Sequence, residues 1–164
     1  MKFLRLLIIL IVCCSTLPAH AQTAAGLVIG ENLKVGMTLA DAFKLLGFAQ
    51  AIQAKRGTDP KFDSIAIEYP AHGVVIQSLS GSGSVEGIEA TKSFRGRFAS
   101  GIKIGDNFKT IIGKYGVPDS LTSNVVRYPN LGLFFILDKG KLVSAKAFAK
   151  NSKLLGKRLV SSAQ

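Results

Sequence analysis

Hydrophobic and polar residues alternate along the chain with two different periods, one helical and one strand-like. Apolar side chains recur at helical spacing over 39–46 and again over 108–115, which predicts two short amphipathic helices. Each segment runs into a glycine, Gly47 or Gly116, and glycine ends a helix because it adopts the left-handed cap conformation at little cost. The residues expected to cap the helix starts are Thr38, in a capping-box-like pair with Asp41, and Asp106.

Segments with the strand period follow each predicted helix in the same order. The expected strands are 64–69, 73–79 and 84–90 after the first helix, and 125–128, 132–137 and 142–148 after the second. A Tyr-Pro-x-x-Gly turn joins the first two strands of each set, at 69–73 and at 128–132. Glycine-containing turns at 81–83 and 138–140 join the last two. Antiparallel strands are therefore expected in both halves of the chain.

These parallels indicate an internal repeat. Lys34-Val35-Gly36 recurs as Lys103-Ile104-Gly105 ahead of the two helices, and the first copy carries an insertion near 54–64. A unit of roughly 60 residues buries little apolar surface alone, so two units are expected to share a core. We predict an α+β fold in which two tandem helix–β–β–β units form one antiparallel sheet with both helices packed on one face. The expected boundaries are 33–91 and 102–149 for the units, 92–101 for the linker and 150–164 for a basic tail.

The first residues are typical of a secretory leader. A positively charged start precedes the apolar run 6–14, and Ala19-His20-Ala21 supplies the small residues of a cleavage site. The apolar run falls short of the roughly 20 residues that span a bilayer. The residue before each cysteine is not the small one that lipid attachment requires. Residues 1–21 are therefore predicted to be a cleaved signal peptide, and the protein to be periplasmic or extracellular without a lipid anchor.

The composition narrows the function classes. The chain has 164 residues and a net charge of +11. Its hydrophobic content of 48%, against 19% charged residues, excludes a long disordered chain. Both cysteines, Cys13 and Cys14, lie in the expected leader, so the mature chain would have no disulfide and no cysteine metal ligand. Loss of Lys2 and Arg5 with the leader would leave +9. This charge favours an acidic partner, and a merely basic, soluble surface is the alternative.

The second half carries the short motifs of a known envelope family. They are Lys103-Ile104-Gly105-Asp106, Lys114-Tyr115-Gly116-Val117-Pro118-Asp119, Tyr128-Pro129-Asn130-Leu131-Gly132-Leu133 and Gly140-Lys141-Leu142. In these residues the chain resembles the small bacterial envelope repeats of the BamE/SmpA and β-lactamase-inhibitor-protein type. The resemblance implies helices on one face of an antiparallel sheet and, as in the inhibitors, two tandem units that form a concave surface. The chain departs from BamE in having two units and no lipidation cysteine, and its mature part lacks the disulfides of the inhibitors.

Residues with catalytic potential form no strong motif. His72, the one histidine of the mature chain, lies in the first Tyr-Pro-x-x-Gly turn, and it is interpreted as a turn residue rather than a general base. One histidine without cysteine does not make a zinc site. Glu68, Glu86 and Glu89 are the strand carboxylates that a small hydrolase would use. We predict that the protein is not an enzyme and needs no cofactor or metal.

Strand alternation predicts a binding surface on the sheet. If alternate residues of the last strands face the helices, the residues between them lie on the opposite face. The residues predicted there are Arg127, Phe134, Ile136, Lys146 and Phe148. Aromatic and aliphatic side chains beside Arg and Lys are typical of a protein-binding surface. Two alternatives stay open: one terminus covers this face, or a register shifted by one residue turns these side chains into the core.

Two basic segments remain. Residues 94–98 interleave Phe and Arg, and they are interpreted as a linker or strand between the units rather than as a nucleic-acid segment. The tail carries Lys150, Lys153, Lys157 and Arg158, with Leu154, Leu155 and Leu159 among them. Such a segment can form an amphipathic helix that contacts anionic lipid, or it can fray or pack on its own domain.

Together these features predict an exported, non-catalytic binding protein of the inhibitor or immunity type, monomeric or weakly associating. Its expected partner is another protein with an acidic surface, not nucleic acid. The alternative is a BamE-like factor in envelope assembly or maintenance, and the third hypothesis is the small hydrolase.

Overall fold

The computed structural model describes residues 26–57, 59–150, 152 and 154, so the expected leader at 1–21 lies outside the described residues. Within the described part, the chain forms two α-helices, a small parallel strand pair and one antiparallel sheet of eight strands. The prediction of an α+β fold with a large antiparallel sheet is confirmed. The helices are α1 (Leu39–Leu46) and α2 (Phe108–Tyr115), and the strands, in their order across the sheet, are β2 (Ala51–Lys55), β3 (Ser64–Tyr69), β4 (Val74–Leu79), β5 (Gly87–Ala90), β10 (Lys141–Phe148), β9 (Leu133–Asp138), β8 (Val125–Tyr128) and β7 (Ser120–Leu121).

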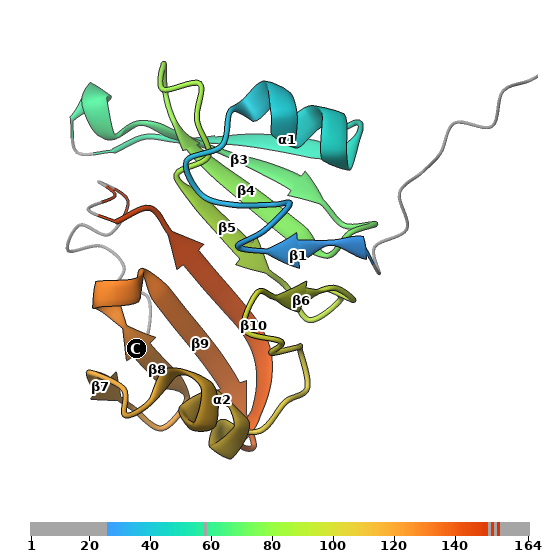
Figure 1. Cartoon of the computed structure of the whole chain (residues 1–164). Helices are drawn as coiled ribbons and strands as arrows, with labels where there is room; N and C mark the ends of the chain where they lie inside the picture. Colours follow the sequence, from blue (N-terminus) through green and yellow to red (C-terminus); the bar gives the residue numbers. More distant parts are fainter. Residues whose placement is uncertain (1–25, 58, 151, 153, 155–164) are drawn as a thin grey trace, which may run out of the picture.

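Both helices lie on the same side of the sheet (Figure 1). Alternate residues of the strands point to this side, where they share one core with Leu46 of α1 and Ile111 of α2. The parallel pair of β1 (Val28–Ile29) and β6 (Arg97–Phe98) packs on this side too, between the two helices. One hydrophobic core therefore holds together the helices, the sheet and the connecting segment, which is residues 91–107 between β5 and α2.

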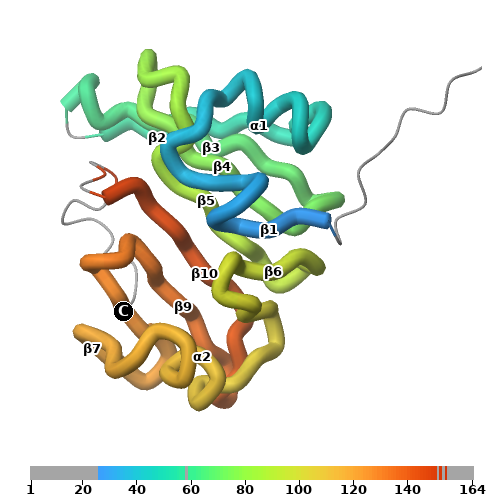
Figure 2. Tube along the Cα trace, in the orientation of Figure 1, coloured from blue at the N-terminus to red at the C-terminus, as the bar shows by residue number. Residues whose placement is uncertain are grey.

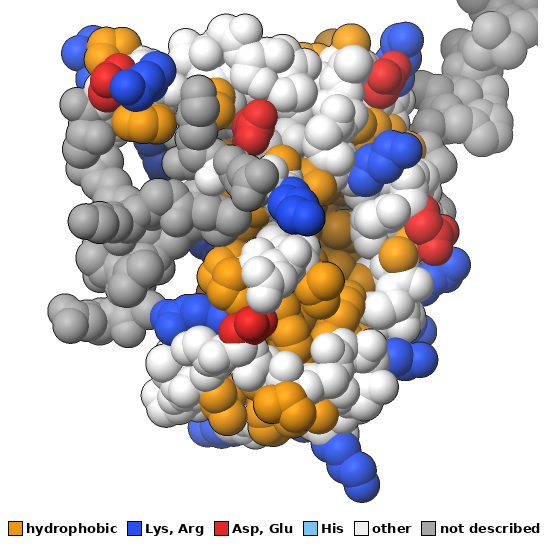
Figure 3. All heavy atoms as spheres, turned by 60° about the vertical axis from the view of Figure 1, so that its left-hand side comes forward, with side chains coloured by type: hydrophobic (Ala, Val, Ile, Leu, Met, Phe, Trp, Pro, Cys, Tyr) orange, Lys and Arg blue, Asp and Glu red, His pale blue; other side chains and the backbone are white. Residues whose placement is uncertain are grey.

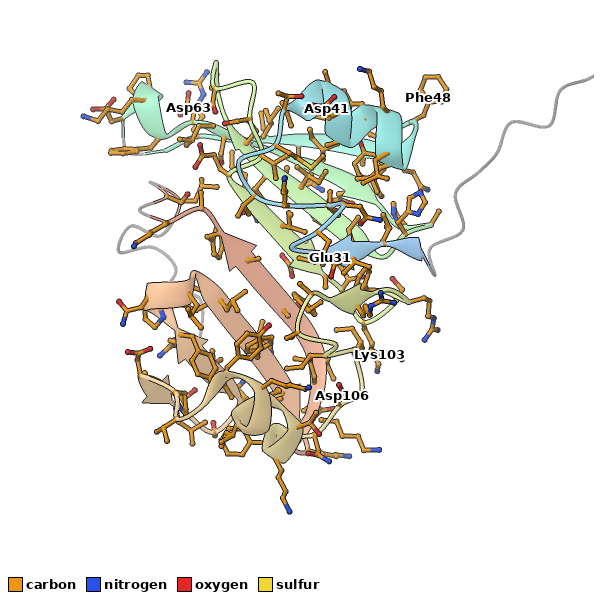
Figure 4. All side chains as sticks on the ribbon, viewed as in Figure 1. Glu31, Asp41, Phe48, Asp63, Lys103 and Asp106 are labelled. Carbon is orange, nitrogen blue, oxygen red and sulfur yellow. The ribbon has the colours of Figure 1, made fainter. Side chains whose placement is uncertain are left out.

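Side-chain caps fix where the helices begin. Thr38 caps α1, as predicted. The cap of α2 is Asn107, whose Oδ1 accepts a hydrogen bond from Thr110 N at 2.9 Å, so the prediction of Asp106 is wrong. The Asp106 carboxylate instead accepts a hydrogen bond from Lys103 N at 2.9 Å, in the turn that leads into α2 (Figure 4). Both residue types can accept from a backbone N–H, and the turn decides which of the two is the cap.

Four strands of the large sheet follow each helix, rather than the predicted three. The additional strands, β2 and β7, lie at the two edges of the sheet. Most of β2 is exposed and β7 has only two residues, so neither shows the alternation of a half-buried strand. The first part of the segment interpreted as an insertion is therefore the end of an edge strand.

The sheet is continuous because β5 pairs antiparallel with β10 at its centre. Figure 2 shows the chain leaving β5 through β6 and α2 before it returns to the sheet. In this register Ala90 lies opposite Ala145, and both side chains are buried on the helix side. Their small size leaves space for the connecting segment, whose Phe98 ring meets Phe135 edge to face at 6.0 Å.

Glycine is required at the end of both Tyr-Pro-x-x-Gly turns. Gly73 and Gly132 have φ angles of 68° and 66°. A Cβ atom at Gly73 would overlap the backbone of Phe94, and one at Gly132 would overlap the carbonyl of Phe148. The carbonyls of these glycines also accept backbone hydrogen bonds from Thr91 and Phe148, at 2.9 Å and 2.8 Å. Each turn is thus fastened to the end of the last strand in its half of the sheet.

Three tyrosines pack on the helix side of the sheet. The pKa of Tyr69, Tyr115 and Tyr128 is raised, chiefly because burial disfavours the phenolate. The hydroxyl of Tyr128 donates to Gly116 O at 2.8 Å, and that of Tyr115 shares a hydrogen bond of 2.8 Å with Ser100. The buried hydroxyl of Tyr69 has no partner among the described residues. Tyr69 and Tyr128 each begin a Tyr-Pro-x-x-Gly turn, but only the hydroxyl of Tyr128 has a hydrogen-bond partner within the described part of the chain.

This difference predicts opposite outcomes for two matched substitutions. At pH 7, Tyr69→Phe is expected to leave the free energy of unfolding unchanged or higher, because it removes an unsatisfied hydroxyl. Tyr128→Phe is expected to lower it by about 1 kcal/mol, because the bond to Gly116 O is lost. Chemical denaturation of both variants measures the two values, and a loss at Tyr69 as large as that at Tyr128 would contradict the prediction.

The same tyrosines predict a loss of stability at alkaline pH. Their pKa is higher in the folded than in the unfolded chain, so their contribution is fully present below the unfolded pKa of about 10 and is lost as pH rises from there through the higher folded-state pKa. Denaturation curves between pH 8 and pH ~11 should show the fall, and it should be smaller in Tyr69→Phe than in the wild type. An equally steep fall in both would show that other groups cause it.

A third prediction concerns the turn glycines. Gly73→Ala and Gly132→Ala are each expected to destabilise the fold by about 3 kcal/mol, because the added Cβ both strains φ and meets backbone atoms. Gly36→Ala is the matched control, since Gly36 has a φ of 83° but open space around the added atom. It should cost only about 1 kcal/mol. Equal costs at the three positions would show that φ alone matters.

Candidate functional site

The candidate site is the side of the sheet that faces away from the helices, here called the open face. The strand registers bring one row of residues across this face, from one edge of the sheet to the other. In order, the row is Ala51, Glu68, Val75, Glu89, Lys146, Phe134, Arg127 and Ser120. Three of the predicted site residues, Arg127, Phe134 and Lys146, are therefore neighbours on adjacent strands.

Phe134 lies between two cations on this row. Lys146 forms an ion pair with Glu89 at 3.2 Å, and both side chains are 25% exposed. Ser144 Oγ also donates to Glu89, at 3.3 Å. Among the described residues Arg127 forms no ion pair, and its guanidinium donates one long hydrogen bond of 3.5 Å to Ser120 Oγ. The positive charge beside Phe134 thus comes mainly from Arg127, because Lys146 is neutralised by its partner.

Phe148 also lies on the open face, but its side chain is not available to a partner. The residue is only 4% exposed. Its ring packs edge to face against Phe134, with centroids 5.8 Å apart, and it lies over Gly87 of the neighbouring strand. A Cβ atom at Gly87 would approach this ring to 2.9 Å. The expectation that Phe148 is an exposed anchor is therefore wrong. The residue is buried, and its ring packs against Phe134.

Ile136 completes the apolar part of the open face. The register places it between Val125 of β8 and Ser144 of β10. Ile136 and Phe134 are both partly exposed, whereas Val125 is buried. A partly exposed aromatic and aliphatic pair with an adjacent arginine is the surface that this half of the open face presents.

The chain that follows β10 contacts Glu86, the residue that precedes β5. The N–H of Ala149 donates to Glu86 O at 2.9 Å, and Ser152 Oγ donates to the Glu86 carboxylate at 3.2 Å. Lys150 is exposed. The other predicted lipid-contact residues, Lys153, Lys157 and Arg158, lie outside the described residues. Within the described part, no helix is long and apolar enough to cross a membrane.

Each of the three carboxylates that a hydrolase would have used has a hydrogen-bond or ion-pair partner. Glu68 accepts a hydrogen bond from Gln53 Nε2 at 2.7 Å, while Glu86 and Glu89 have the partners given above. Glu68 and Glu89 share a row but are separated by Val75. His72 Nε2 lies 3.1 Å from Leu46 O at the end of α1, which is a structural contact. No three His, Cys, Asp or Glu side chains gather in a cation site within the described residues.

A hollow on the helix side was not predicted from the sequence. This hollow of about 230 Å³ opens between the β1–β6 pair and the C-terminal ends of α2 and β10. Hydrophobic side chains gather in the middle of this face in Figure 3. The lining residues are Ile29, Gly30, Val35, Phe98, Ala99, Tyr115, Leu131, Leu133, Ala147 and Phe148. The only polar side chain among them is Tyr115, whose hydroxyl is already bonded to Ser100.

The chain matches no protein-family model, no curated protein and no solved structure.

Proposed function

We propose that this chain is an exported, non-catalytic binding protein of the inhibitor or immunity type, built from two tandem units. In this proposal it recognises another protein through the open face of the sheet. The observation that carries the proposal is the surface around Phe134. A partly exposed aromatic ring lies beside Ile136 and beside Arg127, a cation without an ion pair among the described residues. Aromatic residues and arginine are the side chains that dominate the binding energy of protein interfaces.

The chemistry of the surface defines the kind of partner. An apolar side chain of the partner would cover Phe134 and Ile136, and an acidic group next to it would pair with Arg127. Burying an unpaired guanidinium is costly, so the acidic group is needed for tight binding. Lys146 adds little, because Glu89 already neutralises it. The proposed partner is therefore a protein whose binding surface combines an exposed hydrophobic side chain with Asp or Glu.

Matching hydrogen bonds support the tandem-unit part of the proposal. Ahead of the helices, the N–H of Gly36 donates to Val85 O at 2.7 Å, and the N–H of Gly105 donates to Leu142 O at 2.8 Å. Behind the helices, the N–H groups of the two cap glycines each donate back into the last turn at 2.8 Å. The strand order supports it as well, since β2 to β5 and β7 to β10 run inward from opposite edges to meet at the centre.

Site-specific photo-crosslinking tests the proposed function. A photoreactive amino acid placed at Ile136 in the native host should capture a partner protein, which mass spectrometry then identifies. Phe48 is the matched control position, because it is fully exposed but projects from the end of α1, on the helix side (Figure 4). The proposal requires a partner captured from Ile136 and not from Phe48. Capture of the same proteins from both positions would overturn it.

Affinity measurements with the captured partner then test the roles of the residues. Arg127→Glu and Phe134→Ala are each expected to weaken binding by at least about tenfold, through the lost ion pair and the lost apolar contact. Arg127 makes only one long hydrogen bond within the chain, so Arg127→Glu should keep the wild-type thermal midpoint. Phe48→Ala is the matched control and should bind like the wild type. Unchanged affinity in Arg127→Glu would contradict the proposed site.

A further inference from the structure

The two edges of the sheet differ in how well they are protected. At one edge, β7 has two residues and follows Pro118, which has no backbone N–H to offer another strand. At the other edge, β2 has five residues, and those from Ile52 to Lys55 are exposed. Alternate N–H and C=O groups of an edge strand point away from the sheet and can pair with a further strand. β2 is therefore the open edge.

β2 also exposes apolar side chains. Ile52 is 65% exposed on the helix side of the strand, where its neighbour Ile67 in β3 is buried. Exposed hydrophobic side chains on an unpaired strand favour association with another chain.

Two charges near this edge have no ion-pair partner within the described residues. Lys55 ends β2, and Glu68 lies in β3 opposite Ala51, at the other end of β2. Lys55, Gln53 and Ala51 share the open face with Glu68, and Gln53 Nε2 holds one oxygen of that carboxylate at 2.7 Å. The edge thus carries a positive charge at one end and a negative charge at the other, on the same face.

We propose that β2 pairs with β2 of a second copy of this chain, antiparallel and centred on Gln53. This is the register in which all five residues of both strands are paired, with Ile52 opposite Ala54 and Ala51 opposite Lys55 of the other copy. The second copy is the partner that the charges favour, because a two-fold axis through Gln53 brings each Lys55 to the Glu68 end of its neighbour. The inference does not depend on the proposed binding function.

The distances are compatible with the proposed ion pairs. Strands lie about 4.8 Å apart, so Lys55 of one copy and Glu68 of the other are about 10 Å apart at Cα, with Ala51 between them. An extended lysine and a glutamate together span this distance, and Ala51 is too small to block them. Both charges point to the open face, so the open faces of the two copies lie on the same side of one continuous sheet. Five residue pairs make a small interface, so the dimer is weak and forms with rising concentration.

Sedimentation velocity of the protein, expressed from the whole coding sequence and purified from the compartment where it accumulates, tests this proposal. Between about 10 μM and about 1 mM, the wild type should shift from monomer to dimer. Lys55→Glu and Glu68→Lys should each raise the dissociation constant by about tenfold, because each puts like charges together. The double variant Lys55→Glu, Glu68→Lys should restore the wild-type value to within about twofold, since it exchanges the two signs.

Lys109→Glu is the matched control, because it makes the same charge change at an exposed position on α2 and should leave dimerisation unchanged. Three results would overturn the proposal: a wild type that stays monomeric, a dimer that neither single reversal weakens, or a double variant that remains as weak as the single ones. The measurement uses the purified chain alone, so its outcome is separate from capture of a partner through Ile136.

Discussion

The pairing of β5 with β10 is the contact on which the rest of the architecture depends. These strands are the last of each half of the sheet, and their antiparallel register joins two four-stranded parts into one. A one-residue slip of this register would turn every side chain of one half to the wrong face. With Ala90 opposite Ala145, the apolar rows of both halves are continuous on the helix side, and the charged row is continuous on the open face.

The same register places a small residue next to an aromatic ring on each face of the sheet, and the two rings have different contacts. On the helix side, small residues at the centre leave space for the connecting segment, so that Phe98 reaches Phe135 and links the halves through the core. On the open face, Gly87 leaves space for Phe148 in the same way. Phe148 in turn contacts Phe134 and limits its freedom to move. An aromatic ring held in one position loses little entropy on binding, which suits Phe134 to contact a partner.

Local patterns in the sequence predicted the parts of the fold that depend on local interactions. The period of the apolar residues located both helices, because each buries one face against the sheet, and the Tyr-Pro-x-x-Gly turns located the joints at Gly73 and Gly132. The cap of α2 was misplaced by one residue, since Asp106 and Asn107 are both good caps and the preceding turn uses Asp106. β2 was missed because an edge strand in solvent needs no alternation.

The candidate site depended more on long-range contacts, and there the sequence was less informative. Alternation along β8, β9 and β10 was sufficient to place Arg127, Phe134, Ile136 and Lys146 on one face. It could not show that Phe148 is buried, because that follows from the lack of a side chain at Gly87, which lies 61 residues earlier on a strand whose register was unknown. The ion pair of Lys146 with Glu89 depends on the same register.

The charges of Lys146, Glu89 and Arg127 around Phe134 affect how readily this exposed aromatic surface associates non-specifically. A partly exposed Phe134 beside Ile136 would favour non-specific association if the surrounding surface were neutral. The chain carries a net charge of +11 over its full length, and like charges on separate molecules oppose their random contact. The ion pair of Lys146 with Glu89 lies on one side of the Phe134 ring, and Arg127 lies on the other. In the proposed function, this charge around an apolar centre opposes random association and favours a partner that brings an acidic group.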